Sequence, residues 1–110
     1  MKITYIFPSR SRESKFFACV DNIIALSESD AFEIIGIFDL DDMVMNSDSV
    51  RERLSTYKNL KSCFGFSKSK VHACNRRLNE ISNDTEIIVL QSDDMLNTYN
   101  KNILKKNYTY

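Results

Sequence analysis

The sequence predicts one α/β domain built on a mostly parallel four-stranded sheet. Apolar, β-prone runs alternate along the chain with segments whose apolar residues recur at helical spacing. The run 33–38 is apolar almost throughout, as parallel strands covered on both faces tend to be. Right-handed crossovers then give a Rossmann-like, three-layer α/β/α half-domain with the expected strand order 3-2-1-4. The topological switch point of this sheet, where the strand order reverses, lies beside the first strand.

The first expected strand is Ile3–Phe7, which Pro8 ends. A helix follows, capped by Ser11 and running to about Ser27. Its buried stripe is predicted to consist of Phe16, Val20, Ile23 and Ile24.

The remaining elements are predicted from the same signals. The expected strands are the second at Glu33–Phe38, the third at Tyr57–Phe64 and the fourth at Thr85–Gln91. The expected helices are a short one near Val50–Leu54 capped by Ser47 or Ser49, one that starts at Ser67, and a final short one at Asn97–Lys106. The helix from Ser67 is predicted to bury the stripe Val71, Cys74, Leu78 and Ile81. The polar run Ser82–Asp84 is expected to form a turn.

Composition excludes several classes of protein. Fifteen basic residues balance fifteen acidic ones, which argues against a broad nucleic-acid interface. No apolar run approaches the roughly 20 residues that span a bilayer, and the first residues lack a signal-peptide pattern, so a cytoplasmic location is expected. The cysteines Cys19, Cys63 and Cys74 have neither disulfide nor zinc spacing and are expected to be small buried apolar residues.

Polar side chains follow each predicted strand. The clusters are Ser9, Arg10 and Arg12; Asp39, Asp41 and Asp42; Ser67, Lys68, Ser69 and Lys70; and Ser92, Asp93 and Asp94. The carboxyl ends of parallel strands share one edge of a sheet, where ligands bind, so the clusters are expected to converge there.

Each cluster has chemistry to offer. Asp93 and Asp94 are hard oxygen ligands of the kind that Mg²⁺ or Mn²⁺ accepts. Asp39 or Asp41 can accept hydrogen bonds from a ribose or a base. The helix start near Ser67, with Lys70 and Arg76, suits a phosphate.

Structural roles remain open for the same residues. Asp pairs also form solvated turns or helix caps, Ser67 can be a plain cap, Arg76-Arg77 can be a solvated helix face, and His72 can be structural. On the expected helix, Asn75 and Asn79 share the face of His72, which makes a polar strip that could face a ligand.

Four segments together resemble the inverting family 2 glycosyltransferases of the GT-A fold. They are Ile3–Arg12, the acidic loop Phe38–Asp42, the segment Gly65–Arg76 with an Ala-Arg-Asn-like stretch, and Val89–Met95, which is similar to the metal-binding Asp-x-Asp segment. They occur in the order of the family and span nearly the whole chain.

The resemblance implies that residues 1–110 are a single, truncated, donor-binding domain for a nucleotide-diphosphate sugar, most simply a UDP-sugar. By position, Pro8, Ser9 and Arg10 would line the nucleoside pocket, and Asp39 or Asp41 would meet the base or ribose. Lys70, Asn75 and Ser92 would lie near the donor. Asp93, with Asp94 beside it, would ligate Mn²⁺ or Mg²⁺.

The chain departs from the family in two ways. Gln91 stands where the first Asp of Asp-x-Asp is usual, and no acidic residue or histidine follows Asp94. Inverting transfer needs a base to deprotonate the acceptor. The expectation is therefore donor binding, with sugar transfer doubtful because the half of the family fold that carries the acceptor site and base is missing.

Two other functions stay open. Ile37–Met43 resembles the first motif of haloacid-dehalogenase-type phosphatases, which would make Asp39 the nucleophile and Asp41 the acid/base. Alternatively, the chain is a non-catalytic α/β interaction domain or a remnant of a glycosyltransferase. An uncovered half-sheet would then favour a homo-oligomer or a partner that covers it.

Overall fold

The structure, a computed structural model, describes residues 2–27 and 31–92. Its sheet contains four parallel strands in the order β3-β2-β1-β4, which confirms the predicted fold class and strand order. The strands are β1 (Lys2–Pro8), β2 (Ala31–Asp39), β3 (Leu60–Gly65) and β4 (Thr85–Leu90).

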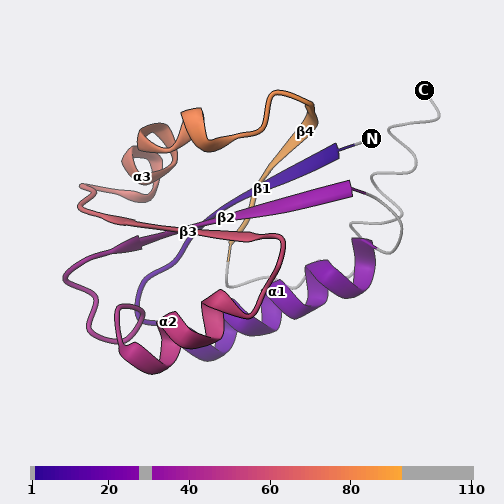
Figure 1. Ribbon diagram of the computed structural model, residues 1–110. Coiled ribbons are helices and arrows are strands. Elements are labelled where there is room, and N and C mark those ends of the chain that lie inside the picture. The colour runs from indigo at the N-terminus through magenta and orange to yellow at the C-terminus, as the bar shows by residue number, and fades with distance from the viewer. Residues whose placement is uncertain (1, 28–30, 93–110) are drawn as a thin grey trace.

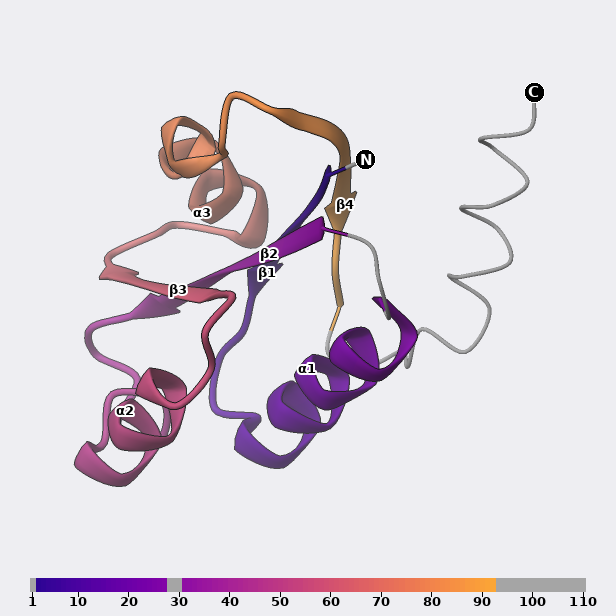
Figure 2. The same ribbon diagram turned by 45° about the vertical axis from the view of Figure 1, so that its right-hand side comes forward.

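Helices cover both faces of the sheet (Figures 1 and 2). The helices are α1 (Glu13–Ser27), α2 (Asp48–Ser55), α3 (Lys70–Arg76) and the short 3₁₀ helix η1 (Leu78–Glu80). The helices α1 and α2 lie on one face, and α3 lies on the other. Right-handed crossovers require this arrangement, because the path from β3 to β4 runs back across the sheet.

The face under α1 and α2 holds the larger core. Aromatic rings dominate it: Phe16 of α1 contacts Phe7 and Phe38, with ring centroids 4.5 and 5.1 Å apart. Fully burying one such side chain contributes about 1.5–3 kcal/mol. This core fixes β1 and β2 side by side, and their carboxyl ends carry the site described below.

The face under α3 holds a smaller core of Ile6, Ile35, Ile37, Cys63 and Ala73. Cys19 and Cys63 are buried as predicted, whereas Cys74 is only half-buried. Burial raises the pKa of the Cys63 thiol, which therefore stays protonated at neutral pH.

Several predicted boundaries were wrong. Ile24 is 41% exposed, and Phe17 and Cys19 are buried in its place. The third strand begins at Leu60 rather than Tyr57, because the Tyr57 ring stacks on Phe17 and its hydroxyl donates to Asp21.

The helix α3 is shorter than predicted. It ends at Arg76 and is capped by Ser69 rather than Ser67, so the expected stripe is broken and Leu78 is exposed. The cap Ser47 of α2 and the turn before β4 are as predicted. The predicted helix Asn97–Lys106 lies outside the described residues.

A buried polar network closes the amino-terminal end of the sheet. Glu33 of β2 accepts hydrogen bonds from the hydroxyl of Thr4 and from both the amide and the hydroxyl of Ser82. Thr4 is fully buried and also contacts Thr85 of β4. The network ties three strands together at the edge opposite the candidate site.

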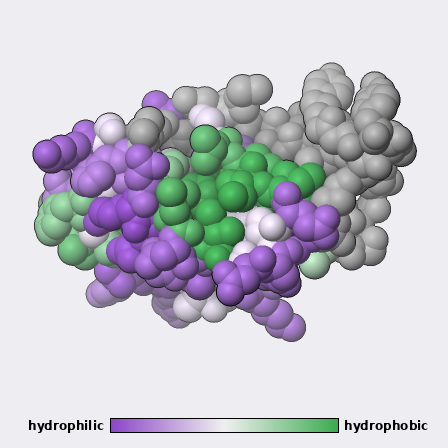
Figure 3. Space-filling model, turned by 90° about the horizontal axis from the view of Figure 1, so that it is seen from above, coloured by the Kyte–Doolittle hydropathy of each residue, from purple (hydrophilic) through white to green (hydrophobic). Residues whose placement is uncertain are grey.

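The strand β4 carries exposed apolar side chains on the α3 face of the sheet. Ile88 is 52% exposed and Leu90 is 72% exposed. The view onto this side of the molecule shows an apolar surface bordered by hydrophilic residues (Figure 3). Within the part of the chain that the structure describes, no helix is long and apolar enough to cross a membrane.

Candidate functional site

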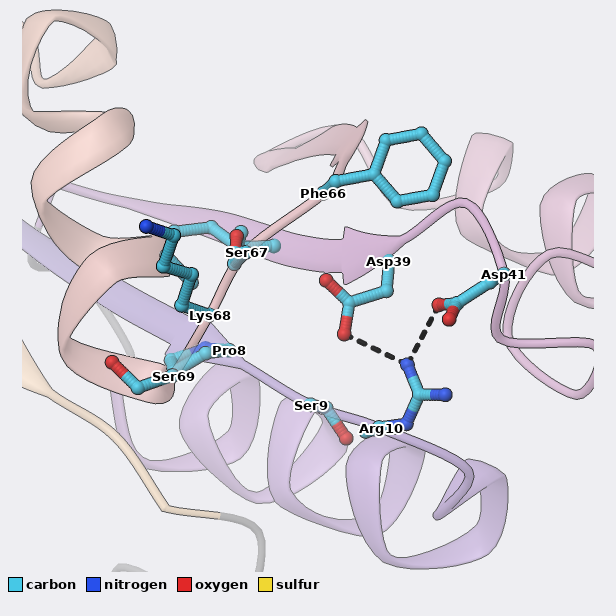
Figure 4. Close-up of a pocket in the computed structure, with 11 residues that line it drawn as sticks. Pro8, Ser9, Arg10, Asp39, Asp41, Phe66, Ser67, Lys68 and Ser69 are labelled. Carbon is cyan, nitrogen blue, oxygen red and sulfur yellow. Dashed lines mark hydrogen bonds and ion pairs between the residues drawn. The ribbon is translucent and has the colours of Figure 1, made fainter.

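A pocket of about 400 Å³ opens at the carboxyl ends of β1, β2 and β3, on the α3 face (Figure 4). Its walls come from three loops and from the first turns of α3. The lining residues are Pro8, Ser9 and Arg10; Ile37, Asp39 and Asp41; and Phe66, Ser67, Lys68, Ser69 and Ala73. The predicted convergence of polar clusters at this edge is therefore observed for three of the four strands.

The first wall follows from the way β1 ends. Pro8 lacks an amide hydrogen and stands last in the strand, and the Ser9 amide then donates to the carbonyl of Ile37 at 3.1 Å. This bond keeps Ser9 buried against β2. Arg10 is the first residue to leave the sheet, so its side chain reaches across the pocket mouth.

Arg10 bridges the two carboxylates that follow β2. One nitrogen, Nη1, donates to Asp39 Oδ2 and to Asp41 Oδ1, each at 2.9 Å (Figure 4). The bond from Arg10 lowers the pKa of Asp41, and the two acidic neighbours raise the pKa of Arg10. The cation thus relieves the repulsion that two neighbouring carboxylates otherwise exert on each other.

The third acidic residue of this loop, Asp42, is structural. Its buried carboxylate accepts bonds from the amide and hydroxyl of Ser11 and from the amides of Val44 and Met45. Burial by itself raises the pKa of Asp42, but these bonds outweigh it and hold the pKa below its usual value. The loop with Asp39 and Asp41 is therefore firmly anchored.

Ser11 does not cap α1 as predicted. Its φ of 56° is in the left-handed region, and its side chain bonds to Asp42 instead of to the helix. This bend after Arg10 brings the β1 and β2 loops together.

The wall formed by the loop after β3 is held beside β2 by a backbone hydrogen bond. Asp39 is the register partner of Gly65, and the Leu40 amide donates to the Gly65 carbonyl at 2.9 Å. Phe66 comes next and is 64% exposed. Behind it, the Ser67 hydroxyl oxygen is buried and has no hydrogen-bond partner among the described residues.

Two residues near the start of α3 have local structural roles. The Ser69 side chain accepts from the His72 amide and caps the helix. The ring nitrogen Nδ1 of His72 accepts from the Lys68 amide at 2.9 Å. The structural role that the sequence left open for His72 is the one observed, and it shapes the loop that carries Ser67 and Lys68.

The pair Arg76-Arg77 is not a solvated helix face. Arg77 Nη2 donates to the Phe64 carbonyl at 3.0 Å, and the Arg76 guanidinium packs on Gly65. Both side chains are half-buried and contact the last residues of β3, next to the pocket.

The structure does not bring all the expected residues into the pocket. Asn75 is exposed on α3 and does not line it, and the Ser92 carbonyl accepts a long contact of 3.8 Å from Cys19 Sγ of α1. The side chain of Lys70, and Asp93 and Asp94 altogether, lie outside what is described. Pro8, Ser9, Arg10, Asp39 and Asp41 do line the pocket.

Sequence reasoning missed Phe66, Ile37 and Ala73 as lining residues. Phe66 had a signal, since it is an aromatic residue between a strand-ending glycine and a polar run, where a core residue is out of place. Ile37 and Ala73 carried none, because both look like ordinary core positions.

Among residues 2–27 and 31–92, no group of three or more His, Cys, Asp or Glu side chains could hold a metal ion. Asp39 and Asp41 are already paired with Arg10, so the described pocket does not fit a metal centre by itself. No family model matches the chain, and no curated protein or solved structure matches it.

Proposed function

We propose that this domain binds a nucleotide-diphosphate sugar in the pocket at the carboxyl ends of β1–β3. The observation that carries the proposal is the gathering of Arg10 and Lys68 with Asp39 and Asp41 around one cavity of about 400 Å³. Pockets of about 300–1,000 Å³ are usual for small-molecule ligands. A ligand that carries both anionic groups and hydrogen-bond donors matches this mixture.

The acidic and basic side chains of the pocket suit different parts of a nucleotide. Carboxylates accept hydrogen bonds from ribose hydroxyls and from base N–H groups. A guanidinium and an ammonium attract the diphosphate, the guanidinium with two parallel bonds where geometry allows. Arg10 lies at the mouth and spans both carboxylates, so it can reach a phosphate placed beside them.

The metal remains a proposal from the sequence. Asp93 and Asp94 would hold Mn²⁺ or Mg²⁺, and a bound ion would neutralise diphosphate charge. Binding, rather than sugar transfer, is the proposed activity, because the two carboxylates that line the pocket, Asp39 and Asp41, are both paired with Arg10. The free thiols of Cys19, Cys63 and Cys74 suit a reducing compartment, and the cytoplasm is the proposed location.

Isothermal titration calorimetry tests the proposal with UDP, GDP and UDP-sugars, each with and without Mn²⁺. We expect binding that weakens at least tenfold in Asp39→Asn, because one acceptor becomes neutral and its bond to Arg10 weakens. The matched control is Asp48→Asn, at the exposed start of α2, which should bind as the wild type does. A wild-type chain that binds none of these nucleotides rules the proposal out.

Two further experiments test the metal assignment and the phosphatase alternative. An Asp93→Asn variant that keeps full Mn²⁺ dependence would contradict the metal assignment while leaving nucleotide binding intact. Hydrolysis of an aryl phosphate that is lost in Asp39→Asn would instead favour the phosphatase function.

A second candidate, self-association, is favoured by the apolar surface on β4. We propose that two copies pack through Ile88 and Leu90 about a two-fold axis, since an apolar patch of this kind is complementary to itself. A net charge of zero gives the copies little mutual repulsion. Analytical ultracentrifugation should show dimers that Leu90→Lys dissociates and that Met43→Lys, at an exposed loop position, does not. A monomeric wild type at high concentration contradicts this.

A further inference from the structure

Phe66 is exceptional among the seven phenylalanines of the chain. Phe7, Phe16, Phe17 and Phe38 are buried, and Phe32 and Phe64 pack against the same core. Phe66 alone is mostly exposed, at 64%. Leaving a large aromatic ring in water forgoes about 1.5–3 kcal/mol of burial, so its position in the pocket wall calls for an explanation.

The sheet fixes the backbone that leads to the ring. Gly65 is paired with Asp39 in the sheet, and its carbonyl accepts from Leu40. Phe66 therefore leaves the sheet one residue beyond the partner of Asp39. Figure 4 shows its ring extending from the end of β3 on the same side as Asp39 and Asp41. The aromatic face and the two carboxylates share one pocket.

The unpaired hydroxyl of Ser67 adds a second polar group beside this ring. Its oxygen is buried and bonds to no described residue, and Ser67 lines the pocket, so a bound molecule that reaches this oxygen would supply the hydrogen-bond partner it lacks. An aromatic face, hydrogen-bond acceptors and a spare hydroxyl together match a planar heterocycle with polar edges.

We propose that Phe66 is the stacking platform for the base of the nucleotide and that it confers preference for nucleotides over base-free phosphates. This inference rests on the proposed function, because it assigns the base to one wall of the same pocket. Stacking is tolerant of base identity, since every base has a π face. The ring thus supplies affinity, and the edge contacts to Asp39 and Ser67 select among bases.

A fluorescent substitution tests the stacking directly. The chain contains no tryptophan, so Phe66→Trp introduces a single reporter. Titration with UDP should quench its emission, and titration with ribose 5-phosphate or pyrophosphate should not. The control is Met43→Trp, on an exposed loop residue that does not line the pocket, and its emission should not respond to UDP.

Calorimetry gives the second readout. Phe66→Ala should weaken UDP binding by about tenfold or more, as removal of one base-stacking side chain usually does, and should leave pyrophosphate binding unchanged. If the wild type binds UDP and Phe66→Ala binds it equally well, the stacking inference is overturned while nucleotide binding stands. If the wild type binds no nucleotide, both fail.

Discussion

The guanidinium of Arg76 occupies the space that a side chain at Gly65 would need. A Cβ at position 65 would lie 2.8 Å from Cζ and from Nη2 of Arg76. The nitrogens Nε and Nη2 are buried without a hydrogen-bond partner among the described residues, so the contact is one of packing. Gly65 therefore lets an arginine on α3 close against the end of β3, directly before the pocket wall.

Gly65→Ala should destabilise the protein by about 1 kcal/mol, near the low end of the roughly 1–3 kcal/mol range for overpacking. The estimate is low because the guanidinium is the end of a flexible side chain and can swing away. Urea denaturation monitored by circular dichroism gives the free energy of unfolding.

A double-mutant cycle identifies the cause. In an Arg76→Ala background, the same Gly65→Ala change should cost little or nothing, because the colliding group is gone. Equal costs in both backgrounds would show that the close approach to Arg76 is not what requires glycine here.

Glu33 should make stability depend on pH. Burial raises its pKa, but the bonds from Ser82 and Thr4 outweigh that effect and hold the pKa below its usual value. A lowered pKa means that the unfolded chain takes up the proton first. The stabilisation is fully present above the pKa of an unfolded glutamate, about 4.3, and is lost as the pH falls through the folded value.

Glu33→Gln should therefore cost about 1–3 kcal/mol at pH 7, as the loss of buried hydrogen bonds to a charged group does. The difference from the wild type should shrink below about pH 4. Glu86→Gln, on an exposed position of β4, is the control and should change little at either pH. A Glu33 cost that is independent of pH would refute the assigned charge state.

Asp42 should matter for stability and Asp41 for binding. Asp42→Ala removes the acceptor for two amides of its own loop and for the amide and hydroxyl of Ser11, at a cost of about 2–3 kcal/mol. Asp41→Ala should leave thermal stability nearly unchanged, because its carboxylate is exposed and bonds to the equally exposed Arg10. Thermal denaturation of both variants, beside UDP titration of Asp41→Ala, separates the two roles. Equal losses of stability would be inconsistent with this division.

The sequence was sufficient for the strand order but not for all element ends. Continuous apolar runs and alternation specify a parallel sheet, and the crossover rule leaves few topologies. The start of β3 was predicted too early because Tyr57 has strand propensity. In the structure its ring stacks on Phe17 and its hydroxyl donates to Asp21. Those are tertiary contacts between α1 and a loop, which local pattern does not encode.

The sequence predicted where the site lies, at the carboxyl ends of the strands, but not which side chains contact one another there. Topology alone places the clusters after β1, β2 and β3 together. It does not show that Arg10 reaches both Asp39 and Asp41, or that Asp42 turns inward to Ser11, whose backbone is in the left-handed region. A serine in that conformation carries no distinctive sequence signal.

The pairing of charges around the pocket has a kinetic consequence. Arg10 and Lys68 offset Asp39 and Asp41, so the lining carries no net charge. Electrostatic steering accelerates association when a cleft presents a field of one sign, and salt then slows it. Stopped-flow measurements should therefore give an association rate for an anionic nucleotide that varies little between low and moderate ionic strength. The ligand would be captured by contact at short range, after it arrives by diffusion alone.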